Sequence, residues 1–256
     1  MDEPTRSIEL EIEVAGTPEE VWQAIATGPG ISSWFVPHTV EEREGGAAMA
    51  SFGPGPEMQI PGRVAAWEPP HRVVFDGGED SGGLAFEWLV EARDGGTCIV
   101  RLVNTGFGSG DDWDGQYDGM TEGWKLFLLN LQLHMQHFPG RTARSVLPTA
   151  TWPGPRERAW AALCDALGLP VAPAPGDRIS AASAEAPTLA GTVVDSGQGR
   201  IALLLDQPAP GTAFLAAEGT GDQVNVSVWS YLYGSEGENA ADRDGPLWWT
   251  WLSDHA

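Results

Sequence analysis

The stretch LAFEWLVEARDGGTCIVRLVN, residues 84–104, contains two alternating runs joined by a tight turn. Apolar side chains recur at every second position on both sides of the turn: Phe86, Trp88 and Val90 before it, and Cys98, Val100 and Leu102 after it. A period of two is typical of half-buried β-strands, and the two glycines of RDGGT suit a chain reversal. The stretch therefore predicts an antiparallel hairpin with one face turned to a core.

Other parts of the first half extend this hairpin into a larger sheet. Residues 7–14, SIELEIEV, alternate strictly between apolar residues and glutamates, which indicates a strand with one wet face. Shorter runs at about 46–52, 58–67 and 71–76 are separated by Gly and Pro, and the last two are joined by an EPPH turn. We expect these runs to form an antiparallel meander with the hairpin.

Two helices are predicted in the same half. Thr17, Pro18 and Glu20 provide an N-cap, a proline at the first helical position and a capping box for a short helix. Residues 120–140 have a helical apolar period and end at Pro-Gly. The intervening TGFGSGDDWDGQYDG, residues 105–119, is predicted to be a loop.

The order of these landmarks resembles that of a known family. They are TPEEVWQAI, WFVP, GRVAAWEPPHRVVF, GGTCIVRLVNTGF and GWKLFLLNL, within about residues 7–138. They resemble the SRPBCC or START-like helix-grip superfamily, most closely its bacterial homologues of the heat-shock ATPase activator. The resemblance implies an α+β fold, in which a curved antiparallel sheet wraps around a long C-terminal helix.

The second half resembles the first when the chain is shifted by 138 positions. Trp22 then falls on Trp160, and Gly16 on Gly154, without a gap. We predict a helix-grip domain over 1–142 and a degenerate second copy over 143–256, with an antiparallel meander at 188–233. An unrelated α+β tail is the alternative. PVAPAPGDRISAASAEAPT, residues 170–188, offers no counterpart of Trp34 and Phe35, and the last helix is expected to have about three turns, so any second cavity should be smaller or absent.

The resemblance implies a cavity between the long helix and the sheet, closed at one end by the segment ISSWFVPH, residues 31–38. Trp34 and Phe35 would then be lid residues, and the alternative is that they plug the end of the core. The residues expected to bind a ligand are all apolar or aromatic: Trp34, Phe35, Phe86, Trp88, Phe107, Trp124, Phe127, Leu128 and Leu131.

Charge limits the partners that the chain can bind. The net charge is -22, and residues 1–144 hold 9 basic and 23 acidic residues, a balance of -14. Such a field repels polyphosphate and anionic lipid, so nucleic acid and membrane are not expected partners. It equally disfavours an anionic ligand, and we expect a neutral or weakly cationic hydrophobic molecule.

Signals of catalysis and of metal binding are weak. The sequence holds no nucleophile elbow, no HExxH and no Gly-rich phosphate loop. His134 and His137 lie three apart on the long helix without a third ligand in view, and DDWDGQYDG lacks the calcium-loop register. No catalytic residue, metal or cofactor is therefore assigned.

These features favour a non-enzymatic protein that binds a small hydrophobic molecule. The alternatives are an enzyme of the polyketide cyclase or aromatase type, and a co-chaperone that acts through its surface on a chaperone partner. The cyclase alternative would need polar groups such as Arg101 with Glu87 or Glu91 in the cavity, and we expect these charges on the outer face of the sheet. The N-terminus shows no signal peptide and the two cysteines suggest no pairing, so a cytoplasmic location is expected.

Overall fold

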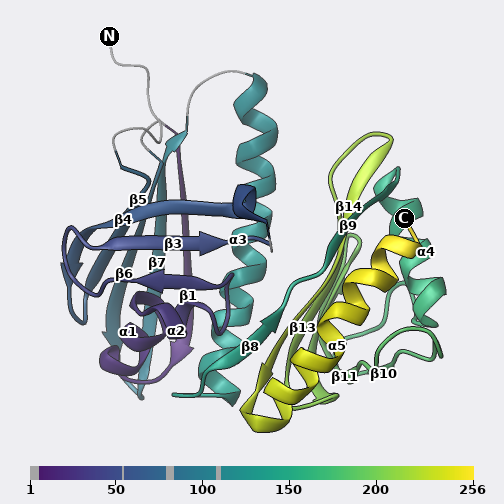
Figure 1. Ribbon diagram of the computed structural model, residues 1–256. Helices are drawn as coiled ribbons and strands as arrows, with labels where there is room; N and C mark the ends of the chain where they lie inside the picture. The colour runs from purple at the N-terminus through teal and green to yellow at the C-terminus, as the bar shows by residue number, and fades with distance from the viewer. Residues whose placement is uncertain (1–5, 54, 79–83, 108–110) are drawn as a thin grey trace. The chain divides into compact units, whose positions relative to one another are not determined.

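The computed structural model describes residues 6–53, 55–78, 84–107 and 111–256, with the backbone alone at 111–116 and 118. The chain divides into two compact units, Met1–Thr142 and Ala143–Ala256 (Figure 1). Each unit has an antiparallel sheet and its own hydrophobic core. The fold class is thus α+β, as predicted.

The N-terminal unit contains a seven-stranded sheet in the order β1-β7-β6-β5-β4-β3-β2. Its strands are β1 (Arg6–Ala15), β2 (His38–Val40), β3 (Ala47–Ser51), β4 (Gln59–Glu68), β5 (Arg72–Asp76), β6 (Ala85–Arg93) and β7 (Thr97–Phe107), and a short 3₁₀ helix, η1 (Pro56–Met58), precedes β4. In the predicted hairpin, Trp88 of β6 lies opposite Leu102 of β7. β1 pairs with β7, which is the last strand of this sheet in the sequence.

The short first helix forms as its capping signals predict. α1 (Pro18–Ala26) begins after Thr17, whose hydroxyl accepts a hydrogen bond from the Glu20 backbone N–H at 3.3 Å. The Glu20 carboxylate accepts in return from the Thr17 N–H at 2.8 Å, which completes the capping box. Val21, Trp22 and Ile25 are buried, as expected. A four-residue helix, α2 (Gly28–Ile31), follows and leads into the segment that contains Trp34.

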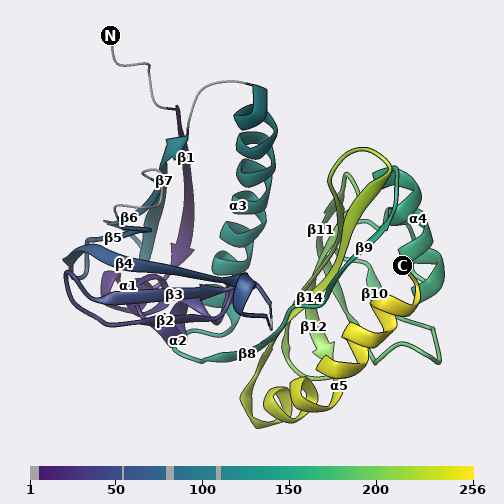
Figure 2. The ribbon, with the colours of Figure 1, turned by 45° about the horizontal axis from the view of Figure 1, so that its top comes forward.

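The long helix α3 (Asp111–His137) starts about nine residues before its predicted beginning. The prediction of a loop over 105–119 is therefore wrong at both ends, because β7 continues to Phe107 and α3 begins at Asp111, and residues 108–110 lie outside the described residues. Glycines and clustered aspartates made this part read as a loop, although acidic residues in a first turn favour a helix N-terminus. Tyr117 also gives it a tertiary anchor, because its hydroxyl donates to the Ser7 carbonyl at 3.0 Å. Figures 1 and 2 show α3 standing along the sheet, with α1 and α2 near one end.

The C-terminal unit confirms the predicted meander. Its strands are β8 (Ala143–Val146), β9 (Thr149–Pro153), β10 (Arg178–Ser180), β11 (Ala190–Gly197), β12 (Arg200–Gln207), β13 (Gly211–Glu218) and β14 (Gln223–Tyr233). The sheet order is β10-β11-β12-β13-β14-β8, and β9 also pairs with β14. The early strands again pair with the last one, as β1 pairs with β7, which agrees with a second copy of the fold.

Two helices complete this unit. α4 (Arg156–Leu167) buries Trp160 and Leu163 and contacts β13 and β14. α5 (Gly234–Asp254) has 21 residues, so the expectation of about three turns is wrong. The polar, Gly-containing stretch before Pro246 looked like a loop, but Ala240 and Ala241 are buried there and extend the helix toward its N-terminus. Within the described residues, no helix has the length and apolar character needed to cross a bilayer.

Candidate functional site

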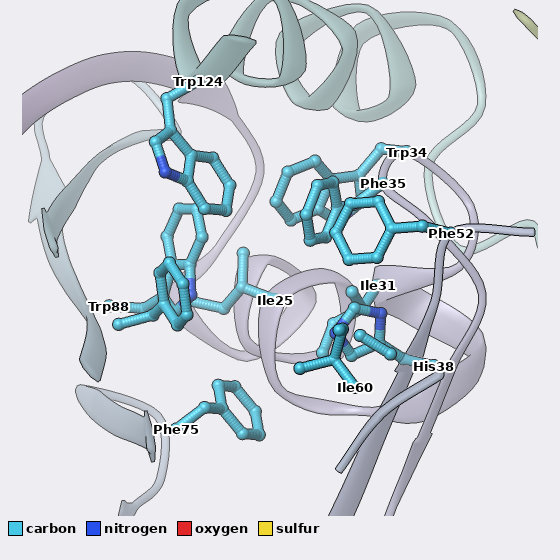
Figure 3. A pocket seen from close by; sticks show the side chains of 12 residues that line it. Ile25, Ile31, Trp34, Phe35, His38, Phe52, Ile60, Phe75, Trp88 and Trp124 are labelled. Atoms are coloured by element: carbon cyan, nitrogen blue, oxygen red, sulfur yellow. The ribbon is translucent and has the colours of Figure 1, made fainter. Parts of the chain in front are cut away.

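An apolar cavity of about 130 Å³ lies in the N-terminal unit, between α3, the sheet and the segment that follows α2 (Figure 3). Nearly all of its lining is aliphatic or aromatic. The lining residues are Ile25, Ile31, Trp34, Phe35, His38, Ala50, Phe52, Ile60, Phe75, Phe86, Trp88 and Trp124. In Figure 3, Trp88 and Trp124 lie on one side of the cavity and Trp34, Phe35 and Phe52 on the other.

Trp34 ties the segment after α2 to both neighbouring helices. Its indole N–H donates to the Ala24 carbonyl in α1 at 2.9 Å. The Asn130 side chain of α3 donates to the Trp34 carbonyl at 2.8 Å. The side chain is 1% exposed, so Trp34 combines the burial of a core residue with a place in the cavity wall.

Phe35 lies between this segment and α3. It is only partly buried, and its ring centroid is 5.0 Å from that of Trp124 and 4.4 Å from that of Phe127. Phe52 meets it edge-on at 5.9 Å. These contacts are the edge-to-face and tilted arrangements that aromatic pairs prefer. Unlike Trp34, Phe35 makes no side-chain hydrogen bond, so a movement of its side chain costs less free energy.

The strands β5 and β6 supply the opposite wall. Phe86 and Trp88 are two residues apart on β6 and therefore share a face, and Phe75 lies opposite Phe86 on β5. The Trp88 ring centroid is 5.5 Å from those of Trp34 and Trp124. Large aromatic residues of β5, β6, α3 and the segment after α2 thus surround one space.

His38 is the only ionisable side chain among these lining residues. Its Nδ1 lies 2.7 Å from the Val36 carbonyl oxygen, and its backbone N–H donates to the Ser32 hydroxyl at 2.8 Å. Burial lowers the pKa of His38, because the cavity does not solvate an imidazolium. The imidazole is therefore neutral at pH 7.

Two hollows adjoin the cavity. A groove of about 310 Å³ shares His38, Ala50 and Phe86 with it and continues over β3, β4 and β5. The one charged side chain on the groove is Asp76, and Arg63 pairs with it at 2.8 Å and lowers the pKa of that carboxyl. A second hollow, of about 170 Å³, shares Phe35 and Trp124 with the cavity and extends along α3.

The structure brings together part of the predicted residue set. Five of the nine line the cavity, namely Trp34, Phe35, Phe86, Trp88 and Trp124, and Phe127 lines the second hollow. Phe107, Leu128 and Leu131 are buried in the core and line none of these three spaces. Lining residues that the prediction omitted are Ile25, Ile31, His38, Ala50, Phe52, Ile60 and Phe75.

The charged residues considered for catalysis lie away from the cavity. Arg101 pairs with Glu11 at 3.4 Å, and both are exposed. Glu87 alternates with the cavity residues of β6 and pairs with Arg72 at 2.5 Å. Glu91 is likewise exposed. The expectation that these charges occupy the outer face is confirmed.

Comparison with known proteins places the N-terminal unit in a family. Residues 15–136 match the family described as Activator of Hsp90 ATPase homolog 1-like protein. Curated proteins yield no match. Among solved structures, the Aha1 dimer from Colwellia psychrerythraea is 18% identical and covers 52% of this chain and 97% of its own, with a TM-score of 0.45. The di-domain ARO/CYC BexL from the BE-7585A biosynthetic pathway is 17% identical and covers 98% of both chains, with a TM-score of 0.46.

Proposed function

Residues 15–136 form an Aha-type helix-grip domain, and we propose that this domain binds a small hydrophobic molecule without chemical conversion. One observation carries the proposal: the aromatic cavity between α3 and the sheet. An apolar cavity of about 150 Å³ in a protein core is known to stay dry and to bind benzene. At about 130 Å³ the cavity has the size of one aromatic ring, and its two neighbouring hollows offer room for a substituent.

The charge pattern supports a neutral or weakly cationic ligand. No Asp, Glu, Lys or Arg is found among the described residues that line the cavity, and its one ionisable group, His38, is neutral at pH 7. A carboxylate would lose its hydration there without gaining a cationic partner. The acidic surface of the unit adds long-range repulsion. Nucleic acid and membrane remain outside the proposal, and the free cysteines Cys98 and Cys164 suit a cytoplasmic setting.

Toluene is a suitable probe, because its ring matches the cavity and because Trp34, Trp88 and Trp124 report on occupancy. We expect a saturable change in tryptophan fluorescence with toluene, and no such change with benzoate. Replacing Ala50 with phenylalanine places a ring at the cavity wall and should weaken toluene binding at least about tenfold, or about 1.4 kcal/mol.

Ala47→Phe is the matched control, since Ala47 is exposed on the same strand, β3, and lines none of the three hollows. It should bind toluene as the unaltered protein does. Equal binding by both variants would place the toluene elsewhere, and the absence of saturable binding to the unaltered protein would remove the proposal.

The family match supports a second candidate, stimulation of a chaperone ATPase through the surface of the domain. Turnover of an Hsp90-type ATPase, measured with saturating amounts of this protein, tests it directly. Stimulation that persists in Ala50→Phe would assign the activity to the surface rather than to the cavity. A cyclase function has less support, because the described residues lining the cavity include no carboxylate and no cationic side chain.

A further inference from the structure

The imidazole of His38 is fixed in one tautomer. A carbonyl oxygen can only accept a hydrogen bond, so the 2.7 Å contact with the Val36 carbonyl places the proton on Nδ1. In the neutral ring, Nε2 then carries a lone pair and acts as an acceptor. In the part of the chain that the structure describes, no residue donates a hydrogen bond to Nε2.

The position of this acceptor is set by its surroundings. The Ser32 hydroxyl accepts from the His38 backbone N–H and donates to the Gly28 carbonyl at 2.7 Å. The Gly28 backbone packs closely against this segment, since a Cβ there would lie 3.0 Å from the His38 carbonyl oxygen. The His38 ring packs against Phe35, with ring centroids 5.5 Å apart. The imidazole is therefore held at the wall of the cavity from both the backbone and the ring side.

His38 also lies where the enclosed cavity meets the groove over β3 and β4, because it lines both. Figure 3 shows its ring near Ile31 and Ile60. Nε2 is not among the fully buried polar atoms that lack a partner, so water can reach it, and a ligand that displaces this water has to replace the hydrogen bond. The lining offers no other strong acceptor, and Nε1 of Trp124 is a buried donor without a hydrogen-bond partner, so Nε2 of His38 is the group to which a ligand can donate.

We propose that the ligand is a neutral aromatic alcohol of the phenol type, whose hydroxyl donates a hydrogen bond to Nε2 of His38. Its ring occupies the space between Trp34, Phe35 and Trp88, and its remaining substituents extend into the adjoining groove. The inference rests on the proposed hydrophobic binding and specifies the chemical class of the ligand. It also explains why an apolar site keeps one neutral imidazole.

The test compares p-cresol with p-xylene, which have nearly the same shape and differ by a hydroxyl in place of a methyl. Dissociation constants are measured by isothermal titration calorimetry for the unaltered protein and for His38→Phe. Phenylalanine keeps an aromatic ring and removes the acceptor. We expect the ratio of the two constants to shift about three- to tenfold against p-cresol in the variant, the effect of one net hydrogen bond.

Two further variants separate this effect from a general loss of shape. His38→Gln keeps an acceptor oxygen and should retain part of the preference for p-cresol. Phe75→Leu alters another lining residue without touching the acceptor, and it should weaken both ligands by a similar factor. A ratio that is the same in the unaltered protein and in His38→Phe would overturn the role of His38, while leaving the hydrophobic site intact. Failure of both ligands to bind the unaltered protein would remove both proposals.

A measurement on the unaltered protein covers the case in which His38→Phe does not fold. The ¹⁵N resonance of Nε2 in a neutral imidazole moves upfield when that nitrogen accepts a hydrogen bond. We expect this movement on saturation with p-cresol and not with p-xylene. Equal ¹⁵N shifts with the two ligands would contradict the proposed contact, since p-xylene has no proton to donate.

Discussion

Replacing Trp34 with alanine should lower the free energy of unfolding of the N-terminal unit by about 3–5 kcal/mol, the usual cost of truncating a buried tryptophan. The side chain is 1% exposed and packs against α1 and β6, so its removal leaves a void that the surrounding elements cannot easily fill. The Ala24 carbonyl also loses the indole donor. Urea unfolding followed by hydrogen exchange of peptides from β6 and β7 reports on this unit alone.

Phe35→Ala is the comparison that isolates the position of Trp34. Phe35 is adjacent in sequence and lines the same cavity, but it is partly exposed and has no side-chain hydrogen bond to lose. We expect a smaller loss of stability and a clear loss of toluene affinity. If Trp34→Ala and Phe35→Ala lower the free energy of unfolding equally, Trp34 does not anchor the segment after α2, and its deeper burial adds no stability.

Acid should destabilise the protein through His134. This side chain is 3% exposed in α3, and burial lowers its pKa to about 4. An unfolded chain binds a proton at the ordinary histidine pKa of about 6.5, so between these values the unfolded state holds more protons. The free energy of unfolding therefore falls as the pH drops from about 6.5 to 4, by about 3 kcal/mol in total.

His134→Gln should remove this part of the pH dependence, whatever its effect on stability at pH 7. The free energy of urea unfolding is measured at several pH values between 7 and 4 for the unaltered protein and for His134→Gln. The difference between the two pH profiles isolates the contribution of His134, because the carboxylates contribute equally to both. His137→Gln is the control, since it removes an exposed histidine three residues further along the helix. The explanation fails if the slope of His134→Gln equals that of the unaltered protein.

Local chemistry made much of the N-terminal unit predictable. The capping box at Thr17, the alternation in β1 and the glycine turn between β6 and β7 each determine structure within a few residues, and the structure shows all three. The starts of α3 and α5 were missed because their first turns contain glycines and acidic residues, which by local preference suit a loop equally well. In such stretches, tertiary contacts such as that of Tyr117 with Ser7 decide whether a helix or a loop forms.

The cavity was harder to predict than the fold. Phe86, Trp88 and Trp124 stand out as large aromatics in clear periodic patterns, and all of them line it. His38 begins the three-residue strand β2, and Phe52 follows the five-residue strand β3, and such short strands have too few residues to reveal from sequence which face is buried. Leu128 and Leu131 share the apolar face of α3 with Trp124, but that face is wide, and sequence spacing does not show which part borders an open space.

The pairing of β1 with β7 has a consequence for synthesis on the ribosome. Residues 6–15 are made before residues 97–107, the strand with which they pair among the described residues, so β1 waits until most of the unit has been made. Its apolar positions, such as Ile8 and Val14, are unprotected during this interval. Glu9, Glu11 and Glu13 alternate with them and give the waiting segment a dense negative charge, which opposes association between nascent chains. The glutamates that mark the wet face of the finished sheet thus also act as gatekeepers against aggregation before that sheet exists.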